Sequence, residues 1–156
     1  MASDTPRPVE GTPPIELTGA VVVITGGASG IGRATAERVV AEGGRAALVD
    51  LDLAKAQDVA AEIGSGCIGL GANVADEAQV VDMVSQVASD FGTINGLINN
   101  AGILRDGLLI KSRDGEIQKM SLAQWQSVID VNLTGVFLGT REVAAKMVEL
   151  GSTGLI

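Results

Sequence analysis

The sequence predicts an α/β fold, a doubly wound parallel sheet with helices on both faces. Short apolar runs that suit buried strands alternate with longer stretches whose apolar residues recur at helical spacing. The first four apolar runs also lead into a polar residue, respectively Thr25, Asp50, Asn73 and Asn99. Such alternation implies right-handed crossovers, so these polar residues should meet at the carboxyl edge of one sheet, where ligands bind.

The elements follow one another regularly along the chain. Strands are expected over 20–24, 46–49, 67–72 and 94–98. Helices are expected over 31–40, 53–63, 77–91 and 121–150. The first helix stops at a Gly43-Gly44 signal, and Ser121 with Gln124 forms a capping box that opens the last one. Residues 103–120 are expected to be irregular, with a charged turn over 112–115.

The predicted domain boundaries follow from the two ends of the sequence. Residues 1–14 contain all four prolines and are predicted to form a flexible arm. Residues 15–156 are predicted to form one domain that is incomplete at its C-terminus. The reason is that Leu155-Ile156 resembles the start of a fifth strand, so we expect the sheet to be truncated there and the chain to be a fragment.

Composition excludes several classes of function. A net charge of −8 argues against binding to nucleic acid or to anionic membranes. No apolar run is long enough for a membrane span, and the first residues lack the pattern of a signal peptide. A single cysteine, Cys67, is consistent with a reducing cytoplasm. The chain has no histidine, which excludes Ser-His-Asp and Cys-His catalysis and histidine-ligated metal, and we expect no metal site.

A glycine-rich turn separates the first predicted strand from the first helix. Its spacing is Gly26-x-x-x-Gly30-x-Gly32, which differs from the G-x-G-x-x-G fingerprint, and no Gly-Lys-Ser/Thr follows it. Glycines let the backbone turn sharply, and the helix starting near Ile31 offers free N–H groups and the positive end of its dipole. This arrangement suits a phosphate and predicts a Rossmann-type nucleotide-binding unit.

A carboxylate follows the second predicted strand. Asp50 lies 18 residues after Gly32, where it can accept hydrogen bonds from both hydroxyls of an adenosine ribose and would repel a 2′-phosphate. No lysine or arginine flanks it, and Ser29 stands at the turn position where a phosphate-binding base would lie. This pattern favours NAD over NADP. The alternative is that Asp50, with Asp52, merely caps the following helix.

Four segments together resemble a known family. Residues 25–32 (TGGASGIG), 73–74 (NV), 99–102 (NNAG) and 131–135 (VNLTG) are similar, in this order, to the motifs of the short-chain dehydrogenases/reductases. The resemblance covers roughly residues 17–156. The stretch 99–109 (NNAGILRDGLL) is similar to 3-oxoacyl-[acyl carrier protein] reductases.

The resemblance implies a role for each matching residue. It implies that the glycine turn holds the pyrophosphate, that two residues hold the adenosine ribose, that two border the adenine, and that three line the nicotinamide side. In that order the residues are Gly26, Ser29, Gly30, Ile31 and Gly32; Asp50 and Leu51; Asn73 and Val74; and Asn100, Ala101 and Gly102. It also implies that Asn132 is the active-site asparagine, which positions a water in a proton relay. The alternative for Asn132 is that it is a polar residue tolerated on a helix. The alternative for Asn99-Asn100 is that they form an ordinary turn.

The chain also departs from the family pattern. The family's acid/base is a tyrosine in a Tyr-x-x-x-Lys turn, preceded by a serine, and this chain has no tyrosine. Lys146, with Glu142 four residues earlier, is expected to form a surface ion pair instead. Asn95 stands where the family often has aspartate. Because the chain has no tyrosine to act as the acid/base, we expect it to be inactive on its own.

Three functional hypotheses follow. The first is an NAD(P)-dependent short-chain oxidoreductase that transfers a hydride between nicotinamide and a carbonyl or secondary alcohol of a small molecule. The second is a non-catalytic dinucleotide-binding module, and the third is a structural fragment that binds nothing. The resemblance also implies a homo-oligomer formed through the helix over 121–150.

Overall fold

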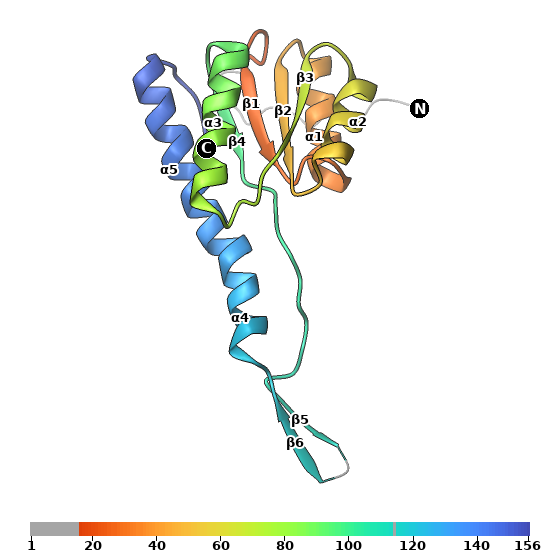
Figure 1. Cartoon of the computed structure of the whole chain (residues 1–156). Coiled ribbons are helices and arrows are strands. Elements are labelled where there is room, and N and C mark those ends of the chain that lie inside the picture. The colour runs from red at the N-terminus through yellow and green to blue at the C-terminus, as the bar shows by residue number, and fades with distance from the viewer. Residues whose placement is uncertain (1–15, 114) are drawn as a thin grey trace, which may run out of the picture.

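A four-stranded parallel sheet forms the centre of the protein. The structure, a computed structural model, describes residues 16–113 and 115–156. The strands are β1 Val21–Thr25, β2 Arg45–Asp50, β3 Cys67–Gly71 and β4 Gly96–Ile98. Their spatial order is β3-β2-β1-β4, and every pairing is parallel (Figure 1). The predicted doubly wound α/β fold is confirmed, whereas the predicted arm over residues 1–14 lies outside the described residues.

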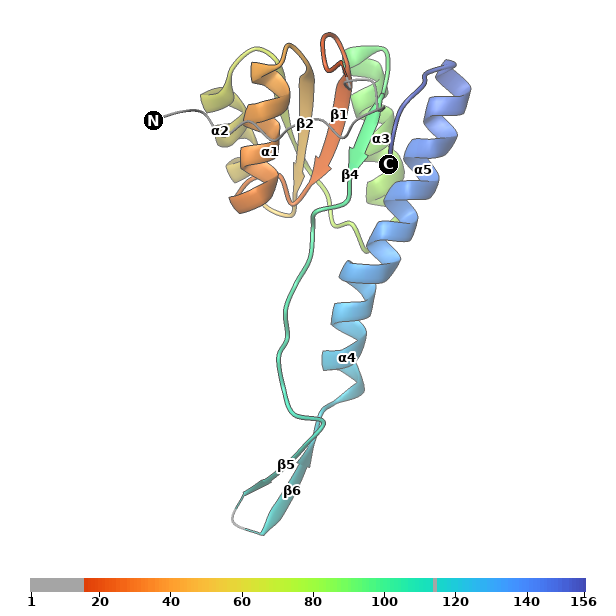
Figure 2. The same cartoon turned by 180° about the vertical axis from the view of Figure 1, so that it is seen from behind.

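Helices cover both faces of the sheet. Helices α1 Gly30–Ala41 and α2 Leu53–Ile63 pack on one face, and α3 Glu77–Phe91 and α5 Gly135–Leu150 pack on the other (Figures 1 and 2). Strand β1 explains the two layers, because its side chains alternate between them. Val21 and Val23 join the core beneath α3 and α5, whereas Val22 and Ile24 join the core beneath α1 and α2.

The predicted helix over 121–150 contains a change of helix type. It consists of α4 Leu122–Ile129, a π-helical turn η1 Asp130–Thr134, and α5. The predicted capping box is present, since Ser121 accepts a hydrogen bond from the Gln124 N–H and the Gln124 side chain accepts one from the Ser121 N–H. A π-turn inside an α-helix often marks a functional position.

The expectation of irregular structure over 103–120 is wrong in its second half. Strands β5 Ile110–Arg113 and β6 Glu116–Lys119 form an antiparallel hairpin, and the Met120 N–H closes it by donating to the Leu109 carbonyl. All eight strand residues are exposed. Because neither face is buried in the chain, the sequence lacks the alternation of apolar and polar residues that identifies a strand.

The C-terminal residues begin to add to the sheet beyond β4. Leu155 forms a parallel bridge with Gly96, with hydrogen bonds from the Leu97 N–H to the Leu155 carbonyl and from the Leu155 N–H to the Asn95 carbonyl. This agrees with the strand expected at residues 155–156. Among the described residues, none of the helices has the length and apolar character needed to cross a membrane.

Candidate functional site

A cavity of about 440 Å³ lies at the carboxyl edge of the parallel sheet. All the cofactor-binding residues predicted from the sequence line it, except Gly32. The structure thus brings together the ends of β1 and β2, the residues that follow β3 and the loop after β4. The lining also includes four residues that the sequence did not indicate, namely Val49, Ala72, Ile103 and Val131.

The glycines of the turn serve different purposes. Gly30 has a φ of +52° with open space around it, a left-handed conformation that favours glycine. Gly32 is buried beneath the turn, where a Cβ atom would lie 2.3 Å from the Gly26 carbonyl oxygen. Gly32 therefore lets α1 approach the turn from below, which is why it does not line the cavity.

The start of α1 offers hydrogen-bond donors to the cavity. The first N–H groups of a helix have no partner within the helix, and the Ser29 side chain does not cap them here. The first turn of α1 also contains no acidic residue to offset the positive end of its dipole. Ser29, Gly30 and Ile31 are exposed beside the cavity. These donors suit an anion such as a pyrophosphate.

Asp50 is held by backbone groups and does not cap a helix. Its Oδ2 accepts a hydrogen bond from the Ala28 N–H at 3.1 Å, and its Oδ1 accepts one from the Asp52 N–H at 3.4 Å. Asp52 is the N-cap of α2 and accepts from the Lys55 N–H at 3.1 Å. The alternative of helix capping thus applies to Asp52 alone. Asp50 ties the end of β2 to the glycine turn and is half-buried at the cavity wall.

The loop after β4 is tied directly to the glycine turn. The Asn100 side chain donates from Nδ2 to the carbonyl oxygens of Thr25 and Gly26, both at 3.1 Å. Asn99 points to the other side and donates to the Thr140 hydroxyl on α5 at 3.1 Å. The two asparagines therefore hold the loop against two different elements, which an ordinary turn would not require.

Residues after β3 form the opposite wall. Asn73 Oδ1 accepts from the Ala75 N–H at 3.0 Å, and the Asn73 N–H donates to the Gln79 side chain at 2.9 Å. Val74 packs against Gly135 at the start of α5, where a Cβ would lie 2.8 Å from the Val74 side chain. Because Gly135 has no side chain, the residues that follow β3 can pack closely against the start of α5.

Asn132 lies in η1 and holds the strap, defined here as residues 103–109. Its Oδ1 accepts from the Ile103 N–H at 2.8 Å, and its Nδ2 donates to the Ile103 carbonyl at 2.9 Å. Asn132 is therefore not simply a tolerated polar residue, because both ends of its amide are paired with the same residue. It does not line the first cavity.

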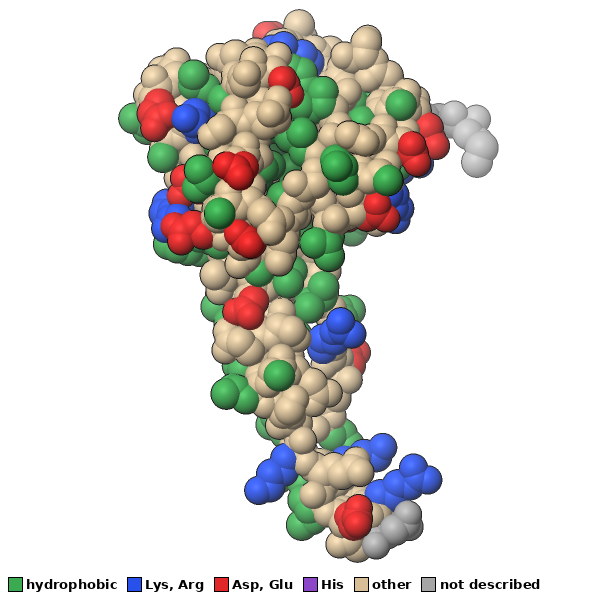
Figure 3. Space-filling model, viewed as in Figure 1, with side chains coloured by type: hydrophobic (Ala, Val, Ile, Leu, Met, Phe, Trp, Pro, Cys, Tyr) green, Lys and Arg blue, Asp and Glu red, His purple; other side chains and the backbone are tan. Residues whose placement is uncertain are grey.

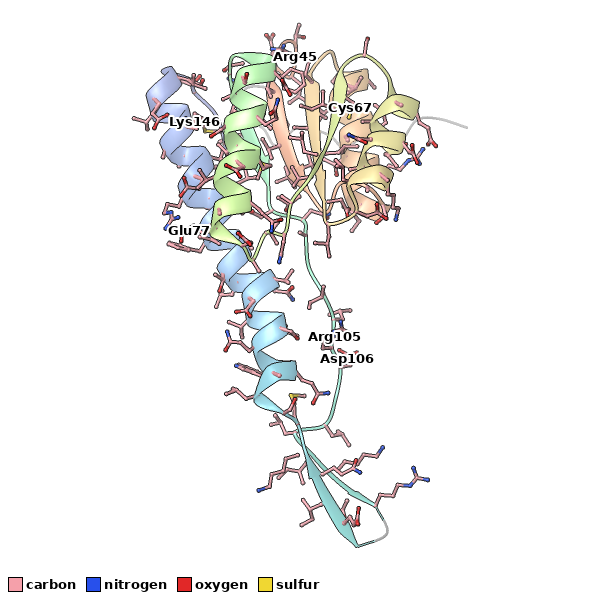
Figure 4. The ribbon with its side chains drawn as sticks, in the orientation of Figure 1. Arg45, Cys67, Glu77, Arg105, Asp106 and Lys146 are labelled. Atoms are coloured by element: carbon pink, nitrogen blue, oxygen red, sulfur yellow. The ribbon has the colours of Figure 1, made fainter. Side chains whose placement is uncertain are left out.

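A second cavity, of about 530 Å³, lies between the strap and α4. Asn132, Trp125 and Met120 line it from one side, and Arg105 and Asp106 line it from the strap (Figure 4). Ile103 lines both cavities. The chain therefore presents a polar nucleotide-sized cavity beside a second cavity with apolar and charged walls.

The other polar residues singled out by sequence have structural partners. Lys146 pairs with Glu149, whereas Glu142 pairs with Arg141, so the expected Lys146–Glu142 ion pair is wrong. The helix places residues three and four apart equally close, and spacing alone does not decide between them. Asn95 Oδ1 accepts from the Val21 N–H at 3.1 Å, and its Nδ2 donates to the Thr153 carbonyl at 3.0 Å.

Metal and thiol chemistry receive no support from the described side chains. Within residues 16–113 and 115–156, no three histidine, cysteine, aspartate or glutamate residues cluster as metal ligands. Burial raises the pKa of the Cys67 thiol to about 11, so the thiol is protonated at neutral pH.

Comparisons with known proteins agree with this geometry. A family model described as short chain dehydrogenase matches residues 20–156. The chain is 38% identical to levodione reductase of Leifsonia aquatica over 146 residues, which cover 90% of this chain and 52% of that protein. It is 40% identical to a 3-oxoacyl-[acyl-carrier-protein] reductase of Synechocystis sp. over 144 residues, covering 90% of this chain and 55% of that protein.

A solved structure has the same fold. The crystal structure of 3-ketoacyl-(acyl-carrier-protein) reductase from Brucella melitensis, complexed with NADH, matches with a TM-score of 0.74 and 34% identity. The match covers 86% of this chain and 52% of that one. The chain thus spans about half the length of the curated relatives that it matches.

Proposed function

Because this chain belongs to the short chain dehydrogenase family, we propose that it forms the cofactor-binding part of an NAD-dependent oxidoreductase. A bound nicotinamide cofactor supplies or accepts the hydride exchanged with the carbonyl or secondary alcohol carbon of a small molecule. The observation that carries the proposal is the single cavity in which the start of α1, Asp50, Val74 and Asn100 converge.

The residues of the cavity fit the parts of such a cofactor. The N–H groups of Gly30 and Ile31 are placed to hold a pyrophosphate. Asp50 and Leu51 are placed for a ribose, and Asn73 and Val74 for an adenine. Asn100, Ala101 and Gly102 lie on the remaining side, together with Gly26, and are proposed to hold the nicotinamide half.

We propose NAD in preference to NADP. The Asp50 carboxylate would repel a 2′-phosphate, and no lysine or arginine lines the cavity among the described residues. Arg33, the basic residue that directly follows the glycine turn, is paired with Glu37 and Glu62 at 2.8 and 2.9 Å. A cation that would bind a 2′-phosphate is therefore engaged elsewhere.

The proton needed for the reaction is the part that this chain does not supply. It contains no tyrosine and no histidine to act as the acid or base. We propose that Asn132 positions a water in a proton relay, holding the strap through its side chain. The 156-residue chain is therefore proposed to bind cofactor without turning over substrate.

The absence of tyrosine also favours a second candidate, a non-catalytic dinucleotide-binding module. Both candidates predict binding, and they differ in what accompanies these 156 residues in the cell. A reading frame that encodes a serine and Tyr-x-x-x-Lys after Ile156 would support the oxidoreductase. A stop codon at that point would support the binding module.

Titration calorimetry with NADH tests the shared proposal. We expect one NADH molecule to bind per chain, with weaker binding of NADPH. An absence of heat at millimolar NADH, from protein with a cooperative unfolding transition, would contradict both candidates.

We also propose a homo-oligomer through the helix over 121–150. Six large apolar side chains along it are exposed, namely Leu122, Trp125, Leu133, Phe137, Val148 and Leu150. A group of large apolar side chains exposed along one helix is typical of a surface that contacts another protein. The reducing cytoplasm is proposed as the location, consistent with the single cysteine of the chain.

A further inference from the structure

The β5–β6 hairpin, residues 110–119 and called the arm from here on, projects away from the sheet and its helices (Figures 1 and 2). Each of its eight strand residues is exposed. A two-stranded hairpin is marginally stable in water unless another element covers it. The arm lines neither the nucleotide cavity nor, apart from its flanking residues, the second cavity.

The two isoleucines of the arm lie on one face, which also carries Lys119. The register pairs Ile110 with Lys119 and Ser112 with Ile117, which places the two isoleucines on one face. Their exposed fractions are 63% and 68%. Lys111 and Arg113 lie on the other face.

The charge of the arm differs from that of the rest of the protein. Residues 110–119 hold three of the 11 basic residues of the chain and only two of its 19 acidic residues. The arm therefore has a formal net charge of +1, and the rest of the chain has a net charge of −9. Figure 3 shows basic side chains gathered at the hairpin and acidic side chains spread over the body that contains the sheet. A second copy of this chain is thus an electrostatically complementary partner for the arm.

Four of the six exposed large apolar residues of the long helix lie symmetrically about position 135, whereas Trp125 and Leu150 lie outside this pattern. Leu133 and Phe137 lie two positions to either side, and Leu122 and Val148 lie thirteen positions to either side. In an antiparallel pair related by a two-fold axis, each of these residues lies level with an apolar residue of the other copy. Lys119 at the base of the arm then lies level with the far end of the other copy's α5.

That end of α5 suits the arm chemically. Its last turn contains no basic residue, and the C-terminus of a helix carries the negative end of the dipole. Glu149 is exposed there and is paired with Lys146, which Figure 4 labels on α5. Leu150 is 41% exposed. The neighbouring α3 ends in the same direction, with exposed Asp90 and no basic residue in its last turn (Figure 1).

We propose that the arm of one copy packs on the C-terminal end of α5 in a second copy, with Ile110 and Ile117 against its apolar residues and Lys119 near Glu149. This inference rests on the proposed pairing through the helix over 121–150. The arm then stabilises the contact between two subunits, and nucleotide binding does not depend on it.

Sedimentation velocity over a range of protein concentrations tests the apolar contact. The double substitution Ile110→Asn and Ile117→Asn is expected to raise the dimer dissociation constant at least about tenfold. The reason is that it removes two isoleucines that dimer formation would bury. Lys119→Glu is expected to raise the dimer dissociation constant more than Lys55→Glu does. The second substitution makes the same charge change at an exposed position of α2. NADH affinity should stay unchanged in all these variants, because the arm lies outside that cavity.

Cross-linking tests the placement in nearly unaltered protein. In a Cys67→Ser background, Lys119→Cys and Glu149→Cys proteins are mixed and treated with a short bismaleimide. The mixed dimer is expected to be the dominant product. A dimer that binds NADH but neither cross-links in this way nor responds to the isoleucine variants would overturn the arm proposal alone. A wild-type protein that binds NADH but stays monomeric would overturn both the arm and the helix pairing, whereas loss of NADH binding would count against the nucleotide function.

Discussion

Thr25 and Asn100 are joined by two hydrogen bonds, and Asn100 is the donor in both. Thr25 Oγ1 accepts from the Asn100 N–H at 3.0 Å, and Asn100 Nδ2 donates to the Thr25 carbonyl at 3.1 Å. The same hydroxyl accepts from the Ala101 N–H at 3.0 Å, and Thr25 is 2% exposed. One buried side chain thus fixes the exit of β4 against the glycine turn.

Thr25→Val is expected to destabilise the protein by about 1–3 kcal/mol. The shape is retained, but the partly buried Ala101 N–H loses its acceptor, and the Asn100 N–H keeps only the Ile98 carbonyl. Urea unfolding measures the change. Thr18→Val, at an exposed threonine, is the control and should alter the free energy of unfolding by less than about 0.5 kcal/mol. Equal effects of both substitutions would argue against this role of Thr25.

Asp50→Asn is expected to narrow the preference for NADH over NADPH by about tenfold or more. The substitution removes the charge that repels a 2′-phosphate and keeps an oxygen that accepts from the Ala28 N–H. Titration calorimetry with both cofactors measures the ratio. Asp52→Asn, at the N-cap of α2, is the matched control and should leave the ratio unchanged. A wild-type protein with equal affinities would remove the basis of the ribose assignment.

Gly32→Ala is expected to abolish measurable NADH binding and to destabilise the fold, because a Cβ there meets the Gly26 carbonyl oxygen at 2.3 Å. Gly30→Ala meets no neighbouring atom and suffers only from its positive φ, at a cost of roughly 1–2 kcal/mol. Thermal unfolding and calorimetry on both variants rank the two effects. The reverse ranking would contradict the described turn.

Asn132→Ala is expected to free the strap. Two hydrogen bonds to Ile103 are lost, each contributing on the order of 1 kcal/mol. Hydrogen exchange of the amides over 103–109 should accelerate, while exchange in α2 stays the same. Asn132→Asp keeps the acceptor and should give an intermediate rate; unchanged exchange in the alanine variant would disprove the contact.

Cys67 makes stability depend on pH in the alkaline range. Its pKa is raised from 9.0 to about 11 by burial, so the unfolded chain loses the proton first. The stabilisation that Cys67 contributes is therefore complete below pH 9 and is lost as the pH rises towards 11. Urea unfolding between pH 8 and about pH 11 should show this decline, and Cys67→Ala should make it shallower.

The sequence was informative wherever a segment is buried or obeys a local rule. The apolar run of β1, the capping box at Ser121 and the residue types at the strand ends were sufficient to predict the sheet and almost the whole lining of the first cavity. These features depend on local chemistry and on the rule that parallel strands end at one edge.

The features that sequence did not predict depend on contacts between distant segments. The π-turn accompanies the pairing of Asn132 with Ile103, 29 residues away. Ile103 itself was missed as a lining residue, although it follows the recognised NNAG segment directly. The hairpin escaped prediction because its strands have no buried face, and only its turn at 112–115 carried a signal.

The position of β1 in the sheet also bears on how the protein folds. β1 pairs with β2 over a short stretch of chain, but its bonds to the loop after β4 join residues 75 apart. Closing so long a loop costs entropy before any contact is gained, and contacts of this separation slow folding. The β1–β2–β3 half is therefore expected to form first. The cavity edge closes only when β4 docks, so a nascent chain should acquire affinity for its cofactor late.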